Sequence, residues 1–119
     1  MAVQDQVEVA AQAAREASRT LGSVDAQTRA NALREMAQAL RDNAEDVIEA
    51  NAKDMAAGED RGLSSAMLDR LFLDEERIEK IAVALEEIAD LPDPVGDVLK
   101  EWTIDNGLQI QRVAIPIGV

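Results

Sequence analysis

Two groups of acidic side chains are the residues of this sequence best suited to acid–base chemistry or to binding a divalent cation, because carboxylates can do both. The first group is Asp42, Glu45, Asp46 and Glu49, and the second is Glu86, Glu87 and Asp90. The first group has helical spacing and lies where one predicted helix gives way to the next. No glycine-punctuated calcium loop surrounds the second group. Both patterns favour helix caps and a solvent-facing surface over a catalytic or metal site.

The sequence lacks the residue types that other catalytic chemistry needs. The chain has no Cys and no His, which removes thiolate nucleophiles, disulfides, and the commonest general base and metal ligand. Gly58 and Gly62 form no dinucleotide-binding or phosphate-binding pattern, and no Ser lies in a nucleophile elbow. Met36, Met55 and Met67 fall on apolar stripes, where core packing is expected. The sequence therefore predicts no catalytic residue, no cofactor-binding residue and no metal ligand.

The charge balance limits the classes of partner. The chain carries 24 acidic and 12 basic residues, for a net charge of -12. Nucleic acids and anionic membranes select clustered positive charge, so neither is an expected partner. A solubilising surface is the favoured interpretation, with salt adaptation or a basic partner as alternatives. No apolar run approaches the ~20 residues that span a bilayer, and residues 1–10 do not resemble a signal peptide. A cytoplasmic protein is expected.

The elements that would position these side chains are mainly helices. Aromatic residues make up only 2% of a chain that is 47% hydrophobic, which favours close-packed helices over a β-sandwich. Apolar residues recur at spacings of three and four. The predicted helices are 4–21, a second carrying the stripe 30–40, a third from 44 to 55 that frays between Gly58 and Gly62, 66–71 and 75–90. In the last of these, the expected buried stripe is Ile78, Ile81, Ala82, Leu85, Ile88 and Ala89.

Short polar residues and glycine mark the predicted helix ends. Gly22 stands where a helix often stops in a left-handed conformation. The segment 23–25 offers caps for the second helix, Asn43 for the third, and Asp74 for the last.

A change of structure is predicted at 92–96, where two prolines and a glycine occur within six residues. Beyond it, 97–104 and 108–115 have the period of strands, and Asn106-Gly107 between them predicts a two-residue hairpin turn. Such a turn would place Glu101 opposite Arg112, a favourable pair. Trp102 is expected to be a packing anchor. The predicted organisation is a helical lobe at 1–91, a linker at 92–96 and a hairpin at 97–119.

The sequence ends on an apolar extended run at 115–119. Such a run needs cover for its backbone and side chains. A longer protein is therefore expected, with an ordinary frayed terminus as the alternative.

Three stretches are more specific than their elements require. Residues 49–55 read EANAKDM, residues 62–71 read GLSSAMLDRL, and residues 91–96 read LPDPVG, followed by NGL at 106–108 and RVAIPIGV at 112–119. In this order they resemble the start of the gamma-glutamyl phosphate reductase family, also called glutamate-5-semialdehyde dehydrogenase, within the aldehyde dehydrogenase superfamily. The resemblance covers nearly the whole chain.

The resemblance implies an aldehyde dehydrogenase-like α/β fold of which this chain is the helical N-terminal part with a hairpin, truncated before the Rossmann domain. It also implies NADP as cofactor, glutamate 5-phosphate as substrate, a cysteine nucleophile, and a homo-oligomer formed through the hairpin. No catalytic residue of the family falls within this chain. Asn51, Asp54, Asp69 and Arg70 match family strings and are interpreted as structural. We expect a fragment of the reductase that is inactive alone. The alternative is a self-contained acidic helical interaction module that binds by strand addition.

Overall fold

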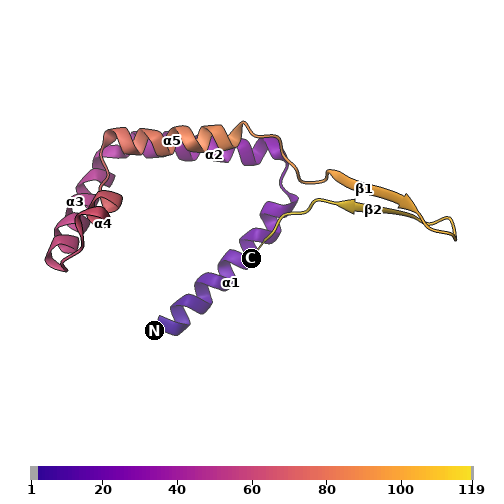
Figure 1. The fold of residues 1–119 in the computed structure, drawn as a ribbon, viewed down its shortest axis with the longest axis horizontal. Helices are drawn as coiled ribbons and strands as arrows, with labels where there is room; N and C mark the ends of the chain where they lie inside the picture. The colour runs from indigo at the N-terminus through magenta and orange to yellow at the C-terminus, as the bar shows by residue number, and fades with distance from the viewer. Residues whose placement is uncertain (1–2, 119) are drawn as a thin grey trace. The chain divides into compact units, whose positions relative to one another are not determined.

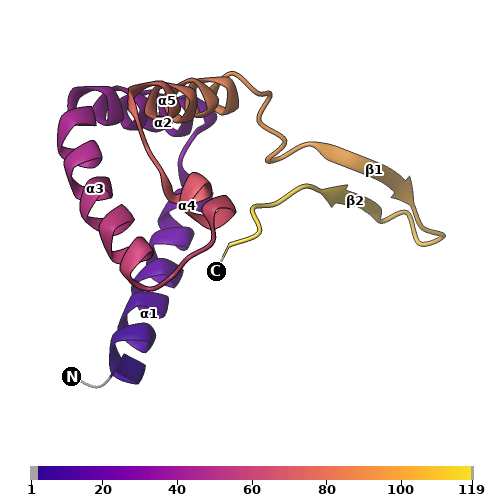
Figure 2. The same cartoon turned by 60° about the vertical axis from the view of Figure 1, so that its left-hand side comes forward.

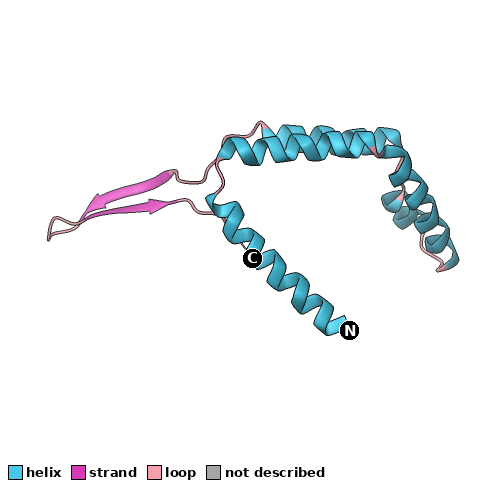
Figure 3. Ribbon diagram, turned by 180° about the vertical axis from the view of Figure 1, so that it is seen from behind, coloured by secondary structure: helices cyan, strands magenta, loops and turns pink. Residues whose placement is uncertain are grey.

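The computed structural model describes residues 3–118 as five helices followed by one antiparallel hairpin (Figures 1 and 3). The elements are α1 Val3–Ser23, α2 Ala26–Asp42, α3 Ala44–Asp60, α4 Ser65–Leu71, α5 Glu75–Ala89, β1 Val98–Thr103 and β2 Gln109–Val113. The prediction of a mainly helical chain with a C-terminal hairpin is confirmed. No helix within the described residues is long and apolar enough to cross a membrane.

Contacts divide the chain into two compact units. One combines the chain up to Arg29 with the chain from Pro92 onward, and the other is Ala30–Leu91. The first therefore joins α1 to the hairpin segment, and the second holds most of α2 with α3, α4 and α5. This grouping of contacts differs from a division at residue 91, and the domain boundaries at 91 and 96 remain a prediction.

The core of the second unit lies between α2 and α5, which run side by side (Figure 1). Ala37 of α2 and Ile78, Ala82 and Ala89 of α5 are buried. Three of these four are alanines, and short side chains let two helices approach closely. In the same unit α4 contacts α3 (Figure 2).

The predicted apolar stripes are only partly buried, so the expectation of full burial is wrong for this chain. Ile81 is 44% exposed, Ile88 53% and Met36 57%. Met67 is also more than half exposed. Neighbouring helices cover only part of the α5 surface, so Ile81 and Ile88 remain exposed to solvent.

Side-chain caps hold two of the helix starts as predicted. The Asp74 carboxylate accepts a hydrogen bond of 2.8 Å from Arg77 N, and Asp25 accepts one of 2.7 Å from Thr28 N. Asn43 does occupy the position before α3, but its side chain makes no cap. Its Nδ2 instead donates to Ala39 O at 2.8 Å. The cap predicted at Asn43 is therefore wrong, because the preceding helix takes the amide.

Two glycines do not end helices as predicted. Gly22 lies inside α1, which continues to Ser23, and its φ is not positive. Gly58 is buried inside α3, where a Cβ would lie 3.1 Å from Leu63 Cδ1 and 3.2 Å from Leu68 Cδ2. Glycine at 58 thus allows close packing rather than fraying. The left-handed residue after α3 is Gly62, with φ +74°.

The hairpin turn has three residues rather than two, and this shifts the predicted register by one. Ile104 N donates to Leu108 O at 3.0 Å, so residues 105–107 form the loop. Only Gly107 has positive φ there, as in the three-residue hairpin loop that ends in a left-handed residue. Asn106 instead accepts a hydrogen bond from Leu108 N at 3.0 Å. The predicted pairing of Glu101 with Arg112 is therefore wrong.

The observed register places Lys100 opposite Arg112, Glu101 opposite Gln111 and Trp102 opposite Ile110. An irregularity between Val98 and Lys100 follows in β1.

Candidate functional site

The first acidic group lies at the corner between α2 and α3. A groove of about 390 Å³ there is lined by Arg41, Asp42, Asn43, Ala44, Glu45, Asp46 and Glu75. Asp42 accepts a hydrogen bond from Gln38 Nε2 at 2.8 Å, and Glu49 forms an ion pair with Lys53 at 3.0 Å. Within residues 3–118, no three acidic side chains are placed to hold a metal ion together.

Two members of the second acidic group, Glu86 and Asp90, form ion pairs that join α5 to α2. Arg41 donates to both oxygens of Glu86, at 2.6 and 3.0 Å, and to both oxygens of Glu79, at 2.9 and 2.8 Å. Farther along, Arg34 pairs with Asp90 at 2.6 Å. Residue numbers rise along α2 as they fall along α5, which is the order expected of antiparallel helices. Two fork-to-fork contacts on one guanidinium are a geometry specific to arginine.

These contacts decide what the carboxylates can do chemically. Hydrogen bonds from Arg41 lower the pKa of Glu79 and of Glu86 below the ordinary value, and the same contacts raise the pKa of Arg41. A carboxylate whose pKa is lowered stays ionised at neutral pH and holds no proton to donate. The arrangement fits interhelical ion pairs that hold α2 and α5 together, and not a general acid.

Asn51, from the EANAKDM string, is a buried polar side chain that joins α3 to the segment after α4. It is 6% exposed. Its Nδ2 donates to Leu71 O at 2.8 Å, and its Oδ1 accepts from Leu73 N at 2.9 Å. The amide therefore satisfies two main-chain groups, the carbonyl of Leu71 at the end of α4 and the N–H of Leu73 just beyond it.

Of the other matched residues, Asp69 is tied to the first turn of α5. Asp69 accepts from Arg77 Nη2 at 2.7 Å, and Arg77 Nη1 donates to Phe72 O at 2.9 Å. The same guanidinium lies 5.3 Å from the centre of the Phe72 ring. Neither the Asp54 nor the Arg70 side chain makes a polar contact among the described residues.

Arg29 is a contact centre that the sequence reasoning missed. Its guanidinium donates to Leu21 O at 3.2 Å, to Val24 O, and to the Asp93 carboxylate. Asp93 belongs to the LPDPVG string, and its other oxygen accepts from Val95 N at 3.1 Å. Arg29 thus links the end of α1 to the linker before β1. No local pattern marks Arg29 for this role, because its carboxylate partner Asp93 lies 64 residues farther along the chain.

A mostly apolar groove of about 330 Å³ lies beside Arg29. It is lined by Ser18, Leu21, Gly22, Arg29, Val95, Pro116 and Gly118.

Residues 3–118 contain no strand–turn–helix cradle of the kind that binds a dinucleotide. A dinucleotide cradle needs a strand, a glycine-rich turn and a helix in succession. Among residues 3–118 the strands form one antiparallel hairpin at the C-terminal side of all five helices. The positive-φ glycines at 62, 96, 107 and 118 do not lie between a strand and a following helix.

Comparisons with known proteins agree on one family. The sequence profile of the aldehyde dehydrogenase family matches residues 1–90. Gamma-glutamyl phosphate reductase of Moorella thermoacetica is 50% identical over 96% of this chain and 27% of its own length. The Paramagnetospirillum magneticum protein of the same name is 53% identical over 91% of this chain and 26% of its own length. The chain thus spans about a quarter of the length of the curated relatives that it matches.

Solved structures match over the same stretch. A crystal structure of gamma-glutamyl phosphate reductase from Thermotoga maritima superposes with a TM-score of 0.83 at 34% identity, covering 90% of this chain and 26% of that one. The Saccharomyces cerevisiae enzyme of that name gives 0.83 at 32% identity, covering 98% of this chain and 29% of that one. Since the family profile spans three quarters of the residues and the fold agrees as well, the chain belongs to the aldehyde dehydrogenase family.

Proposed function

We propose that this chain is the N-terminal part of an NADPH-dependent gamma-glutamyl phosphate reductase, which converts L-glutamate 5-phosphate to L-glutamate 5-semialdehyde in proline biosynthesis. The observation that carries the proposal is the match to proteins of that name, at 50% identity over 96% of this chain. The fold supports it, because the same arrangement of elements recurs in a reductase structure with a TM-score of 0.83.

The chain alone is proposed to be inactive. In the reaction, a cysteine thiolate displaces phosphate from the acyl carbon, and hydride from NADPH then reduces the thioester to the aldehyde and releases the thiolate. This chain has no Cys to form the thioester. Its own contribution is structural: the Arg41 ion pairs, the Asn51 amide and the Arg29 contacts fix helices that the rest of a reductase would be built upon.

Further parts of the proposal concern cofactor, place and assembly. NADP is proposed for the complete enzyme, with residues outside this chain as its ligands. A cytoplasmic location agrees with the acidic surface and with the absence of Cys. A homo-oligomer through the hairpin is supported by the two-stranded sheet, whose outer edges are unpaired within the described residues.

A chimera tests the proposal. The matching segment of the Moorella thermoacetica reductase is replaced by this chain, and activity is followed in reverse as phosphate-dependent NADPH formation from glutamate 5-semialdehyde. The chimera should be active, because half of the exchanged residues are identical. The 119-residue chain in the same assay should form no NADPH. A chimera that folds but has no activity would sink the proposal, and activity of the chain alone would contradict its assignment as a non-catalytic part.

The alternative of a self-contained interaction module gains no support from the comparisons, since the matched relatives are reductases.

A further inference from the structure

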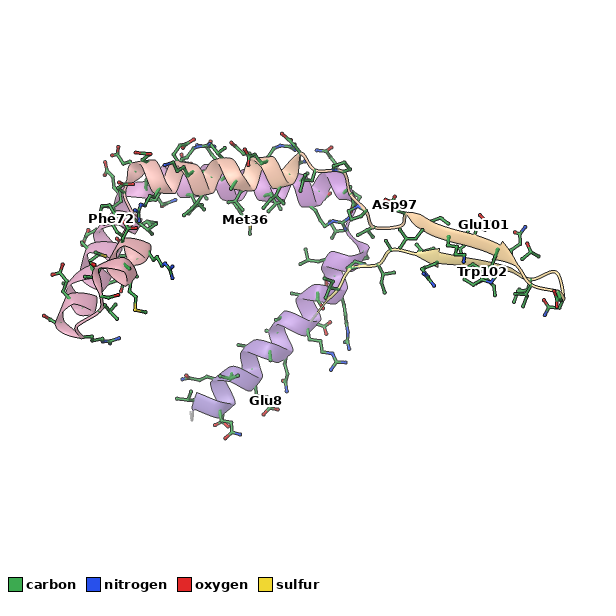
Figure 4. All side chains as sticks on the ribbon, in the orientation of Figure 1. Glu8, Met36, Phe72, Asp97, Glu101 and Trp102 are labelled. Atoms are coloured by element: carbon green, nitrogen blue, oxygen red, sulfur yellow. The ribbon has the colours of Figure 1, made fainter. Side chains whose placement is uncertain are left out.

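The loop of the hairpin contains an asparagine followed by a glycine, a pair whose side-chain and main-chain groups can react with each other. Residues 105–107 join β1 to β2, and Asn106 precedes Gly107 there. All three loop residues are exposed. The loop lies at the opposite end of the hairpin from Asp97, beyond Trp102 (Figure 4). Water therefore has access to the asparagine amide and to the peptide bond that follows it.

The loop holds the Asn106 side chain over that peptide bond. Asn106 Oδ1 accepts a hydrogen bond from Leu108 N at 3.0 Å, which forms an Asx turn across Gly107. The ring closed by this hydrogen bond contains both the amide carbon Cγ of Asn106 and the main-chain nitrogen of Gly107, so the two atoms are kept close. Gly107 has no Cβ to block their approach, and its φ of +85° suits a residue without one.

We propose that Asn106–Gly107 is a site of spontaneous deamidation and isomerisation. The main-chain nitrogen of Gly107 loses its proton to hydroxide and attacks Asn106 Cγ. The new N–Cγ bond closes a succinimide ring, and the Cγ–Nδ2 bond breaks as Nδ2 takes up a proton and leaves as ammonia. Water then opens the ring at either carbonyl. Opening at the side-chain carbonyl gives aspartate, and opening at the main-chain carbonyl gives isoaspartate. Water is the one co-reactant consumed.

One hydrogen bond of the loop restrains the reaction. Gly107 N donates to Ile104 O at 2.8 Å, so the attacking nitrogen is protected while this bond is closed. The bond lies at the free end of a two-stranded hairpin, where local opening costs little. The Asx hydrogen bond uses neither Gly107 N nor Nδ2, so it can persist while the bond to Ile104 opens. The opened loop is therefore the reactive form.

The chain's other asparagines are matched controls. Asn31, Asn43 and Asn51 are each followed by Ala. Asn31 lies inside α2, and Asn51 is buried inside α3, so helical geometry fixes the peptide bond that follows each of them. Asn43 is the nearest match to Asn106, because it is exposed and lies between two helices. Its amide nevertheless donates to Ala39 O of the preceding helix at 2.8 Å, and the next residue carries a methyl group.

Either product would weaken the end of the hairpin. Isoaspartate carries the main chain through Cβ and Cγ, which adds a methylene between Ile104 and Leu108. The hydrogen bond of 3.0 Å from Ile104 N to Leu108 O closes the loop and would have to span this longer connection. Both products also place a new carboxylate beside Asp105, and like charges at this distance repel.

The test is incubation of the 119-residue chain in warm, mildly alkaline buffer, with peptide mapping by mass spectrometry at intervals. Conversion at Asn106 should be at least about tenfold faster than at Asn31, Asn43 or Asn51. It should yield both aspartate and isoaspartate. Equal conversion at all the asparagines, or none at Asn106, would overturn the proposal. Aspartate as the sole product would also overturn it, since direct hydrolysis of the amide forms no succinimide and no isoaspartate.

Two variants separate the chemistry from the setting of the loop. Asn106→Ser removes the amide but keeps an oxygen for Leu108 N, so no conversion should remain at that position. Ala44→Gly places a glycine after the exposed Asn43, outside the hairpin. Conversion at Asn43 should stay well below that at Asn106, and equal rates would refute the role of the Asx turn.

Urea denaturation of the incubated chain measures the effect on the hairpin. Trp102, the chain's only Trp, pairs with Ile110 in this hairpin, so its fluorescence follows the loss of the strand pairing. The incubated wild type should unfold at lower urea than incubated Asn106→Ser, and equal midpoints after full conversion would overturn the predicted weakening. The reaction is measured on the chain alone, so the outcome is independent of reductase activity in the chimera.

Discussion

Replacing Asn51 by Ala should destabilise the α3–α5 region far more than the loss of so few side-chain atoms suggests. The amide is 6% exposed and satisfies two main-chain groups, Leu71 O and Leu73 N, at 2.8 and 2.9 Å. Truncation leaves one buried acceptor and one buried donor without a partner. Each such group costs about 1–3 kcal/mol, so for the two groups we expect a loss of roughly 2–6 kcal/mol in the free energy of unfolding. That is a large part of the stability of a small domain.

Urea denaturation followed by circular dichroism measures this loss. Lys53→Ala is the matched control on the same helix, because the exposed Lys53–Glu49 pair of 3.0 Å should be worth only about 0.3–0.5 kcal/mol. Asn51→Asp keeps the acceptor for Leu73 N but faces a carboxylate toward Leu71 O. Desolvation raises the pKa of such a group, so this variant should be less unstable at acid pH, where it is protonated, than at neutral pH. If Asn51→Ala costs no more than the control, the two hydrogen bonds do not have the value assigned to them.

Two further predictions concern the caps and the ion pairs. Asp74→Ala should cost about 0.5–2 kcal/mol, and Asn43→Ala distinctly less, because only Asp74 accepts from its helix; equal losses in urea denaturation would contradict the cap assignment. Arg41 lowers the pKa of Glu79 and of Glu86, so their contribution is present above the ordinary value of 4.5 and is lost as the pH falls through the folded-state pKa. Arg41→Ala should therefore flatten the acid limb of the stability–pH curve below that value, and an unchanged limb would refute the fastening role.

The helices could be predicted because their signals are local. Apolar spacing and a cap such as Asp74 act within a few residues, and the helix from Glu75 was confirmed with its cap. The predicted cap at Asn43 was wrong because its side chain can either cap α3 or hydrogen-bond to the preceding helix. It donates to the carbonyl of Ala39. The predicted fraying at Gly58 was wrong because tertiary packing explains the glycine. Leucines from beyond the helix occupy the space that a side chain would need.

The ion-pair partners could not be predicted, since they depend on how helices meet. Asp90 is exposed as predicted, whereas Glu86 is partly buried against Arg41 of α2. Their partners Arg41 and Arg34 lie more than forty residues earlier. The hairpin shows the same limit at shorter range. Asn-Gly favours a two-residue turn, but a three-residue loop with only Gly107 left-handed is also available to this sequence. A shift of one residue then exchanged an attractive pair for the repulsive pair of Lys100 and Arg112.

The partly exposed stripes have a different origin from these errors. Periodicity reports the burial that a helix has in its complete protein, whereas this chain covers about a quarter of its relatives. The α5 stripe shows the difference: Ile78 and Ala82 are buried, while Ile81 and Ile88, on the same predicted stripe, are 44% and 53% exposed. The same holds for α1, which has an apolar stripe but no buried residue. Under the proposed function, the side chains that periodicity marks and this chain leaves exposed are those expected to contact the remainder of the reductase.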